Sequence, residues 1–344
     1  MDKNKKEYTI YDLARQLNLS PSTISRALQD SPAISRSTKQ KILKLAADLG
    51  FRTNTYASRL RSKRSSTIGA IVPYIDSFFI SSVIGGIETV VSSKGYNLLI
   101  NQSLESYEKE VKNVQTMYNS RIDGLIISLA ANTPNTGHLK PFFERNVPVV
   151  FFDRVDNTIN CPQYIIDNFN AGYKATAHLI EQGCKNIVYV SGNLLRNVYS
   201  DRMEGYRQAL SDHSLPFNKK NIYISKLDLE AGKEIAQKLL KSNSKVDGIF
   251  IANDKCAIGC MTVLKNAGLR IPDDIAIVGF NNDPITVLVE PGLSTVDYPG
   301  RQMGIRVAND LIGLFSNSSD KKINLKTIIP SELIVRESSL RKKD

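Results

Sequence analysis

Long apolar runs are missing from this sequence of 344 residues. The first residues, MDKNKKEYT, contain no apolar core of the kind that a signal peptide needs. No later stretch of about 18 apolar residues could cross a bilayer. We therefore expect a cytoplasmic protein with no membrane partner.

Cysteine and histidine are scarce, with four cysteines and three histidines in the whole chain. The cysteines show no CxxC spacing, so we predict reduced thiols, no metal site and no cofactor. Cys256 and Cys260 share a helical face at i, i+4, which a metal pair could use. Buried structural cysteine is the commoner role. The other two cysteines are Cys161 and Cys184.

The sequence also lacks the motifs of common catalytic sites. It has no GxSxG elbow, no phosphate-binding P-loop and no Ser-His-Asp order. The histidines, His138, His178 and His213, fall on expected helices with no residue to pair them. These absences argue against an enzyme.

Positive charge is present but unevenly distributed. The net charge is +11, and residues 1–66 hold 14 Lys or Arg against 5 Asp or Glu, a balance of +9. The remainder holds 31 basic and 29 acidic residues, a balance of +2. Lys and Arg release counterions when they contact phosphates, so a small basic segment on a near-neutral body favours nucleic-acid binding.

Two short helices joined by a turn are predicted between Thr9 and Gln29. The first has apolar residues at i, i+3, i+4 and i+7, with Thr9 as its N-cap and Asn18 at its end. The second begins at Ser20-Pro21, a cap followed by proline. Its outward residues suit a recognition helix in a major groove, although an ordinary small helical bundle could present the same polar surface. They are Ser22, Ser25, Arg26 and Gln29.

A third helix and a basic segment follow. Ser35 is predicted to cap the helix, which ends at Gly50. Asn54 can then cap a turn or two presenting Ala57 and Leu60 among four basic residues, a segment too short to be stable alone. It can fold on DNA with Leu60 as an apolar wedge, or it can be a flexible basic linker.

From Thr67 onward, short apolar runs alternate with amphipathic helical stretches, which is typical of an α/β domain. RIDGLIISL at 121–129 and KVDGIFIAN at 245–253 lie 124 residues apart and are alike, so two similar halves are implied. Most runs are apolar throughout, as buried parallel strands are. The predicted strands are 67–73, 96–101, 123–128, 147–153, 164–167, 186–192, 247–252 and 275–281.

Three polar residues follow predicted strands. Ligands of open α/β sheets bind beyond the carboxyl ends of the strands, which places Asp153, Asn253 and Asn281 at a cleft between the two halves. Each residue could instead cap a helix or form a turn, the usual role of Asp and Asn after a strand.

The motifs TIYDLARQLNLSPSTISRAL, LGFRTNTYASRLR, STIGAIVP, VDGIFIAND and VGFNND together resemble the LacI/GalR family of bacterial transcription regulators. The resemblance spans nearly the whole chain and implies three parts. These are a helix-turn-helix three-helix domain at 1–52, a hinge at 53–66, and a periplasmic-binding-protein type I-like effector and dimerisation domain of two α/β subdomains at 67–344. The expected protein is a nucleoid-associated repressor that binds a palindromic operator as a homodimer.

The resemblance also implies site residues. Pro21, Ser22 and Arg26 match base-reading positions, and an arginine there favours guanine. The full set implied for double-stranded operator DNA is Thr9, Tyr11, Ser20, Pro21, Ser22, Thr23, Arg26, Gln29, Asn54, Ala57 and Leu60. The set implied for a small-molecule effector is Phe79, Asp153, Arg154, Arg202, Asn253 and Asn281.

This sequence departs from the family pattern at several positions. Thr53 replaces a proline before the hinge helix, and Gln29 replaces an asparagine. Asn281 stands where aspartate is common, which removes a carboxylate that could accept hydrogen bonds from sugar hydroxyls. With Arg154 and Arg202 nearby, the effector can be a sugar, a sugar acid or a sugar phosphate.

Two other functions are considered. An enzyme acting on a sugar or nucleotide, with a DNA-binding head, would need catalytic groups in the cleft. A periplasmic binding protein would fit the fold, but the basic head and the missing signal peptide argue against it. The tail SSLRKKD has no leucine heptads of the kind that join dimers into tetramers.

Overall fold

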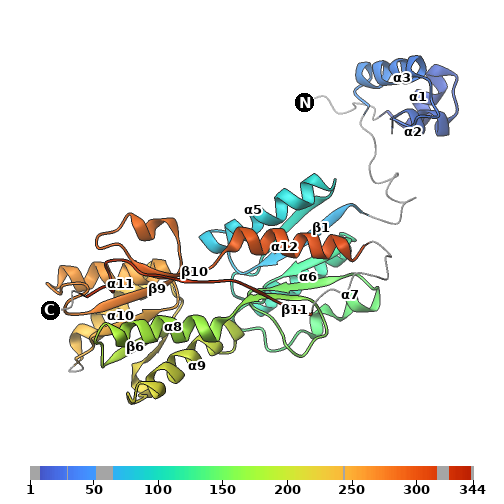
Figure 1. Cartoon of the computed structure of the whole chain (residues 1–344). Helices are drawn as coiled ribbons and strands as arrows, with labels where there is room; N and C mark the ends of the chain where they lie inside the picture. The colour runs from blue at the N-terminus through green and yellow to red at the C-terminus, as the bar shows by residue number, and fades with distance from the viewer. Residues whose placement is uncertain (1–7, 29, 52–64, 243–244, 316–324, 342–344) are drawn as a thin grey trace. The chain divides into compact units, whose positions relative to one another are not determined.

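The computed structural model describes residues 8–28, 30–51, 65–242, 245–315 and 325–341 (Figure 1). The chain divides into two compact units, Met1–Ser65 and Ser66–Asp344. Four predicted DNA-binding residues lie outside the described ranges and stay predictions. They are Gln29, Asn54, Ala57 and Leu60.

The described part of the first unit contains three short helices around one apolar core, as predicted. They are α1 (Ile10–Leu17), α2 (Pro21–Leu28) and α3 (Arg36–Asp48). The most buried side chains come from all three helices, so each helix depends on the other two for its stability. These side chains are Leu13, Ala14, Ile24, Ala27, Ile42 and Ala46.

Hydrogen-bonded caps set the ends of these helices, also as predicted. The Asp12 carboxylate accepts hydrogen bonds from both the backbone N–H and the hydroxyl of Thr9, at 2.8 and 2.7 Å. Ser35 accepts from the backbone N–H of Thr38 at 3.3 Å. Asn18 ends α1 in the left-handed conformation, with φ of 52°. Asparagine tolerates this conformation better than most residues, so the turn to α2 is encoded locally.

The second unit contains two six-stranded sheets. The first has the order β11-β5-β4-β3-β1-β2 and is parallel throughout. The second has the order β12-β10-β9-β8-β6-β7, in which only the β10–β12 pair is antiparallel. The strands are β1 (Thr67–Val72), β2 (Asn97–Gln102), β3 (Gly124–Ile127), β4 (Val149–Phe152), β5 (Gln163–Ile166), β6 (Ile187–Ser191), β7 (Ile222–Ile224), β8 (Gly248–Ile251), β9 (Ala276–Asn281), β10 (Ser294–Asp297), β11 (Lys326–Ile329) and β12 (Leu333–Ile334).

The repeated sequence motif occupies equivalent places in the two sheets. Gly124 begins β3 opposite Ile68 of β1, and Gly248 begins β8 opposite Ile187 of β6. The two strand orders also match position by position. The prediction of two similar α/β halves is therefore confirmed, as is the α/β fold class.

Helices cover the faces of both sheets (Figure 1). Those of the first half are α5 (Phe78–Ser93), α6 (Tyr107–Asn119), η1 (Gly137–Leu139), α7 (Lys140–Glu144) and α12 (Gly300–Gly313). Those of the second are α8 (Asn168–Glu181), α9 (Asn197–Asp212), η2 (Lys219–Asn221), α10 (Leu229–Lys241), α11 (Asp254–Asn266) and η3 (Pro284–Val287). The chain crosses between the halves after β5, after β10 and after β11, so neither half is continuous in sequence.

Pairs of glycines let neighbouring helices approach closely. A Cβ at Gly172 of α8 would collide with the backbone of Arg202 on α9, and a Cβ at Gly205 of α9 would collide with the backbone of Phe169 on α8. The α5–α12 pair has the same reciprocal arrangement with Gly86 and Gly304. Because no larger residue fits, these glycines fix how the helices pack.

All four cysteines are free and buried, so the expected burial is confirmed. Burial raises the pKa of the Cys256 thiol to about 12. In the described ranges, no helix is both long enough and apolar enough to cross a membrane.

The prediction that the histidines have no partners is wrong. His138 Nε2 lies 3.0 Å from Oε1 of Glu110, with both side chains buried, and His178 Nε2 lies 2.7 Å from the Ser339 hydroxyl. His213 Nδ1 lies 2.8 Å from the backbone oxygen of Ala209. The His178–Ser339 contact joins residues 161 positions apart, so patterns within a short stretch of sequence cannot predict it.

Candidate functional site

The outward face of α2 is the candidate nucleic-acid surface. Pro21, Ser22 and Arg26 are exposed, while Ile24 and Ala27 hold the opposite face in the core. No carboxylate within the described part of this unit forms an ion pair with Arg26, so its guanidinium is free to contact a base edge.

Other predicted DNA-binding residues have structural roles as well. Ser20 Oγ accepts from the backbone N–H of Thr23 at 3.1 Å and lies 2.8 Å from the Thr23 hydroxyl. Thr9 caps α1, and Tyr11, two residues further along, is 66% exposed. A residue that caps a helix can also face a phosphate, because helix N-termini attract anions.

Asp153 lies at the end of β4 in the first half. It is buried, its φ is 58°, and its carboxylate accepts hydrogen bonds from the hydroxyls of Tyr298 at 2.7 Å and Ser128 at 3.3 Å. Burial raises the pKa of Asp153, and nearby Arg154 acts in the opposite direction. Phe79 at the start of α5 stacks on Tyr298, with ring centres 4.0 Å apart.

Arg202 on α9 is 3% exposed and projects into the second half. Its Nε donates to Asn168 Oδ1 at 2.9 Å, and its guanidinium carbon lies 3.4 Å from the centre of the Phe280 ring. The rival prediction of a surface ion pair with Asp201 or Glu204 is wrong, since Arg202 is buried and Glu204 pairs with Arg207 at 2.6 Å.

Arg154 connects the two halves. Its Nη1 donates to both carboxylate oxygens of Glu105, at 2.8 and 2.6 Å, and its Nη2 donates to the Tyr199 hydroxyl at 3.1 Å. Glu105 and Arg154 belong to the first half, and Tyr199 belongs to α9 of the second. These hydrogen bonds therefore join a loop of the first half to α9 of the second.

Asn253 and Asn281, the two asparagines predicted at the cleft, differ in the contacts of their side chains. The Asn253 side chain caps α11 by accepting from the Cys256 backbone N–H at 3.2 Å, so the capping role predicted as its alternative is present. Asn281 ends β9 with φ of 112° and is half-buried. Within the described ranges, the Asn281 side chain has no hydrogen-bond partner and can accept or donate to a ligand.

The structure therefore brings Phe79, Asp153, Arg154 and Arg202 near one another through two tyrosines, Tyr199 and Tyr298. Sequence reasoning missed both tyrosines. Tyr298 directly follows β10, a short strand of mixed polarity that was not predicted. A search for polar residues after predicted strands therefore could not select Tyr298. Tyr199 lies three residues before Arg202 on the same helix, a spacing that places both on one face.

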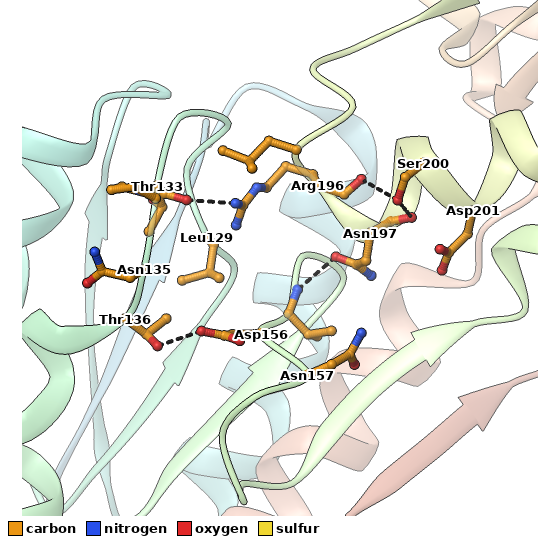
Figure 2. A pocket seen from close by; sticks show the side chains of 13 residues that line it. Leu129, Thr133, Asn135, Thr136, Asp156, Asn157, Arg196, Asn197, Ser200 and Asp201 are labelled. Atoms are coloured by element: carbon orange, nitrogen blue, oxygen red, sulfur yellow. Dashed lines mark hydrogen bonds between the residues drawn. The ribbon is translucent and has the colours of Figure 1, made fainter.

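A pocket of about 280 Å³ adjoins this cluster (Figure 2). None of the six predicted effector residues lines it. Its walls come from the loops after β3 and β4 and from the beginning of α9. The lining residues are Leu129, Thr133, Pro134, Asn135, Thr136, Val155, Asp156, Asn157, Leu195, Arg196, Asn197, Ser200 and Asp201.

The first unit is a helix-turn-helix, and the second has two sheets with polar residues between its halves. Together they define a DNA-binding protein with a periplasmic-binding-protein-like domain. Residues 9–54 match the bacterial regulatory proteins of the lacI family. Residues 65–337 match the periplasmic binding proteins and sugar binding domain of the LacI family. The chain belongs to the lacI family and is a transcription regulator, as the sequence motifs predicted.

Individual relatives agree with this assignment. Catabolite control protein A of Priestia megaterium is 32% identical over 310 residues, 90% of this chain and 92% of that protein. The ribose operon repressor of Halalkalibacterium halodurans is 30% identical over 338 residues, 96% of this chain and 97% of that protein. A crystal structure of the lac repressor dimer bound to operator and the anti-inducer ONPF has the same fold, with a TM-score of 0.85 at 23% identity, covering 98% of this chain and 100% of that chain.

Proposed function

We propose that the protein is a repressor that binds an inverted-repeat operator as a dimer and changes its DNA affinity when a small molecule occupies the cleft. The exposed face of α2 on the basic unit, where Arg26 has no ion pair within the described ranges, carries this proposal. A two-fold dimer presents two identical recognition helices, so its site consists of two half-sites. The operator-bound lac repressor dimer, whose fold this chain shares, supports that arrangement.

DNA contacts are assigned to the first unit and its continuation. Arg26, Ser22 and Pro21 read base edges, while Thr9, Tyr11, Ser20 and Thr23 position α2 on the backbone. The predicted contacts of Gln29, Asn54, Ala57 and Leu60 complete the set. We keep the division into 1–52, 53–66 and 67–344 as part of this proposal, with the protein in the cytoplasm and associated with the nucleoid.

The effector is assigned to the cleft between the halves. Asp153, Arg154, Arg202 and Asn281 offer acceptors and donors for a hydroxyl-rich or acidic molecule, and Phe79 offers an aromatic face. Asn253 contributes at the edge of this set. Among relatives, ribose operon repressors and a regulator solved with cellobiose fit a sugar-type ligand. No cofactor is needed for this role.

The test uses the full chain and genomic DNA fragments. Fragments retained by the protein are footprinted, and the expected result is a protected inverted repeat. The logarithm of the binding constant should fall linearly with the logarithm of salt concentration, because phosphate contacts release counterions. Protection of a single asymmetric half-site would contradict the dimer model. A sugar, sugar-acid and sugar-phosphate panel then tests which ligands change the affinity.

A further inference from the structure

A turn with two strained residues precedes α6. The Ser106 backbone N–H donates to the Ser103 oxygen at 3.1 Å, and the residues between them, Leu104 and Glu105, have φ of 51° and 59°. Positive φ at two successive positions suits glycine or asparagine, and it is strained for leucine and glutamate. Residues held in such conformations cluster at functional sites, which directs attention to the contacts of Glu105.

The Glu105 side chain joins the turn after β2, at the edge of the first sheet, to the segments that follow β3 and β4. Its carboxylate accepts from Nη1 of Arg154 at 2.8 and 2.6 Å and from the backbone N–H of Ala131 at 2.7 Å. The Glu105 side chain is 24% exposed and that of Arg154 is 10% exposed, so salt screens this ion pair little. One carboxylate thereby fixes two segments that are distant in sequence.

Both segments that Glu105 fixes also contact the second half. Arg154 Nη2 donates to the Tyr199 hydroxyl at 3.1 Å, and the backbone oxygen of Ala131 accepts from Asn193 Nδ2 at 3.1 Å. Tyr199 lies in α9, and Asn193 lies in the loop between β6 and α9. Glu105 is therefore connected to the second half by two paths of hydrogen bonds, each through a single intervening residue.

Arg154 also lies between two residues whose backbones bind the second half. The Asn197 side chain of α9 accepts from the Val155 N–H at 3.0 Å and donates to the backbone oxygen of Asp153 at 3.1 Å. Because Arg154 joins these two residues, holding its side chain also restrains the stretch of backbone to which Asn197 is bound.

We propose that Glu105 is a positioning residue that keeps the two halves in contact when the cleft holds no ligand. It acts through Arg154 and Ala131. The separation of the halves before an effector binds then depends on Glu105, because loss of its charge frees both segments that contact the second half. Coupling between two sites is reciprocal, so a weaker contact at α9 should also loosen the segment around Ala131.

The test is hydrogen–deuterium exchange of the full-length protein, without DNA or ligand and at one protein concentration, measured on peptides by mass spectrometry. Glu105→Gln keeps the shape of the side chain and one acceptor oxygen but removes the charge. Exchange should become about threefold faster or more in peptides spanning 129–133 and 196–202, as the loss of part of a hydrogen bond allows. The change at 196–202 separates this role from a local one, because Glu105 reaches those residues through its partners.

The matched control is Glu144→Gln, which removes a negative charge from an exposed position of α7 in the same half. It should leave exchange in both peptides unchanged. Tyr199→Phe removes the hydroxyl at the α9 end of the link and leaves the Glu105–Arg154 ion pair in place. It should speed exchange at 129–133, and it decides the question even if Glu105→Gln does not fold.

The proposal is overturned if Glu105→Gln leaves exchange at 196–202 unchanged, or if Glu144→Gln speeds it equally. It is also overturned if Tyr199→Phe leaves exchange at 129–133 unchanged. Because neither DNA nor ligand is present, failure of the proposed operator regulation would leave this result unaffected.

Discussion

The Tyr298 hydroxyl donates a 2.7 Å hydrogen bond to the Asp153 carboxylate, although 145 residues separate them in sequence. Asp153 directly follows β4 of the first half, and Tyr298 lies in the crossover between β10 and α12. Both side chains are buried. The segment that crosses between the halves after β10 is therefore hydrogen-bonded to the loop that follows β4.

Removal of this hydroxyl should destabilise the second unit. Tyr298→Phe keeps the ring stacked on Phe79 but leaves the buried Asp153 with one donor fewer. The free energy of unfolding should fall by about 1–3 kcal/mol, the usual cost of an unsatisfied buried acceptor. Urea denaturation checks this, and Tyr223→Phe, at a half-buried tyrosine of β7, serves as the control. Equal stability of the Tyr298 variant and the unmodified chain would contradict the prediction.

Loss of Arg26 should relax sequence preference at one base pair in each half-site. Arg26→Ala should cost about 1–3 kcal/mol on the preferred operator, because a bidentate guanine contact is removed. Competition binding against operators substituted one base pair at a time checks this. Arg36→Ala, at the exposed beginning of α3, removes the same charge as a control. If Arg26→Ala weakened all operators equally, Arg26 would be a phosphate contact.

Arg202 should be required for effector response but not for DNA binding. Arg202→Met keeps an unbranched side chain against Phe280 and removes the guanidinium that faces Asn168. Operator affinity without ligand should be unchanged, because the predicted DNA contacts lie in the other unit. The shift in affinity caused by the active ligand of the panel should disappear. A retained shift, equal to that of the control Arg207→Met, would refute the assignment.

Neighbouring glycines of α5 should respond oppositely to the same substitution. A Cβ at Gly86 would collide with the backbone of Arg301 and Ile305, so Gly86→Ala should destabilise the unit by about 1–3 kcal/mol. A Cβ at Gly85 meets only Arg301 Nη1, at 3.6 Å. Gly85→Ala should therefore stabilise it by up to about 1 kcal/mol through helix propensity. Thermal unfolding of both variants checks the signs, and the same sign for both would contradict this account.

Stability should depend on pH through Asp254. This buried carboxylate accepts from the Asp283 backbone N–H at 2.8 Å and the Thr295 hydroxyl at 2.7 Å, and burial raises its pKa to about 7. Between pH 5 and 7 the folded state holds a proton that the unfolded state has released. The free energy of unfolding should therefore fall as pH rises, by at most about 1.4 kcal/mol per pH unit from this group.

The check for Asp254 compares two denaturation series. Asp254→Asn is neutral at every pH, so its stability should fall less steeply than that of the unmodified chain between pH 5 and 7. Asp283, whose pKa burial raises to about 6, contributes a fall in stability of the same sign in both proteins. Parallel pH profiles would exclude an ionising Asp254.

Local signals in the sequence predicted much of this fold. Thr9, Ser20 and Ser35 cap the helices they were expected to cap, and the eight predicted strands are all present. Strands β7, β10, β11 and β12 were not predicted, since they are short and several of their residues are exposed or polar. Short strands of this kind depend on pairing with distant neighbours, which single-sequence patterns do not encode.

The candidate site was harder to predict than the fold. Asp153 and Asn281 follow strands and could be selected by that position alone. Glu105, which pairs with Arg154 across 49 residues, and Tyr298 have no local signal of this kind. The burial of Arg202 and Arg196 depends on packing between α8, α9 and the loops of the first half, so their partners appear only in three dimensions.

The three crossings between the halves affect how the chain can fold during its synthesis. The first half lacks α12 until the ribosome has passed residue 313, and it lacks the edge strand β11 until the ribosome has passed residue 329. Until α12 has been synthesised, the α5 face that packs on it, including Gly86 and Val83, has no covering helix. Exposed apolar faces on a nascent chain are sites where chaperones bind and aggregation begins. The described helices of the second half are complete by residue 287, before α12 of the first half is made, although its edge strand β12 comes only at residues 333–334. The helix-covered core of the second half should therefore reach a protease-resistant state earlier on stalled ribosomes than the half that precedes it in the sequence.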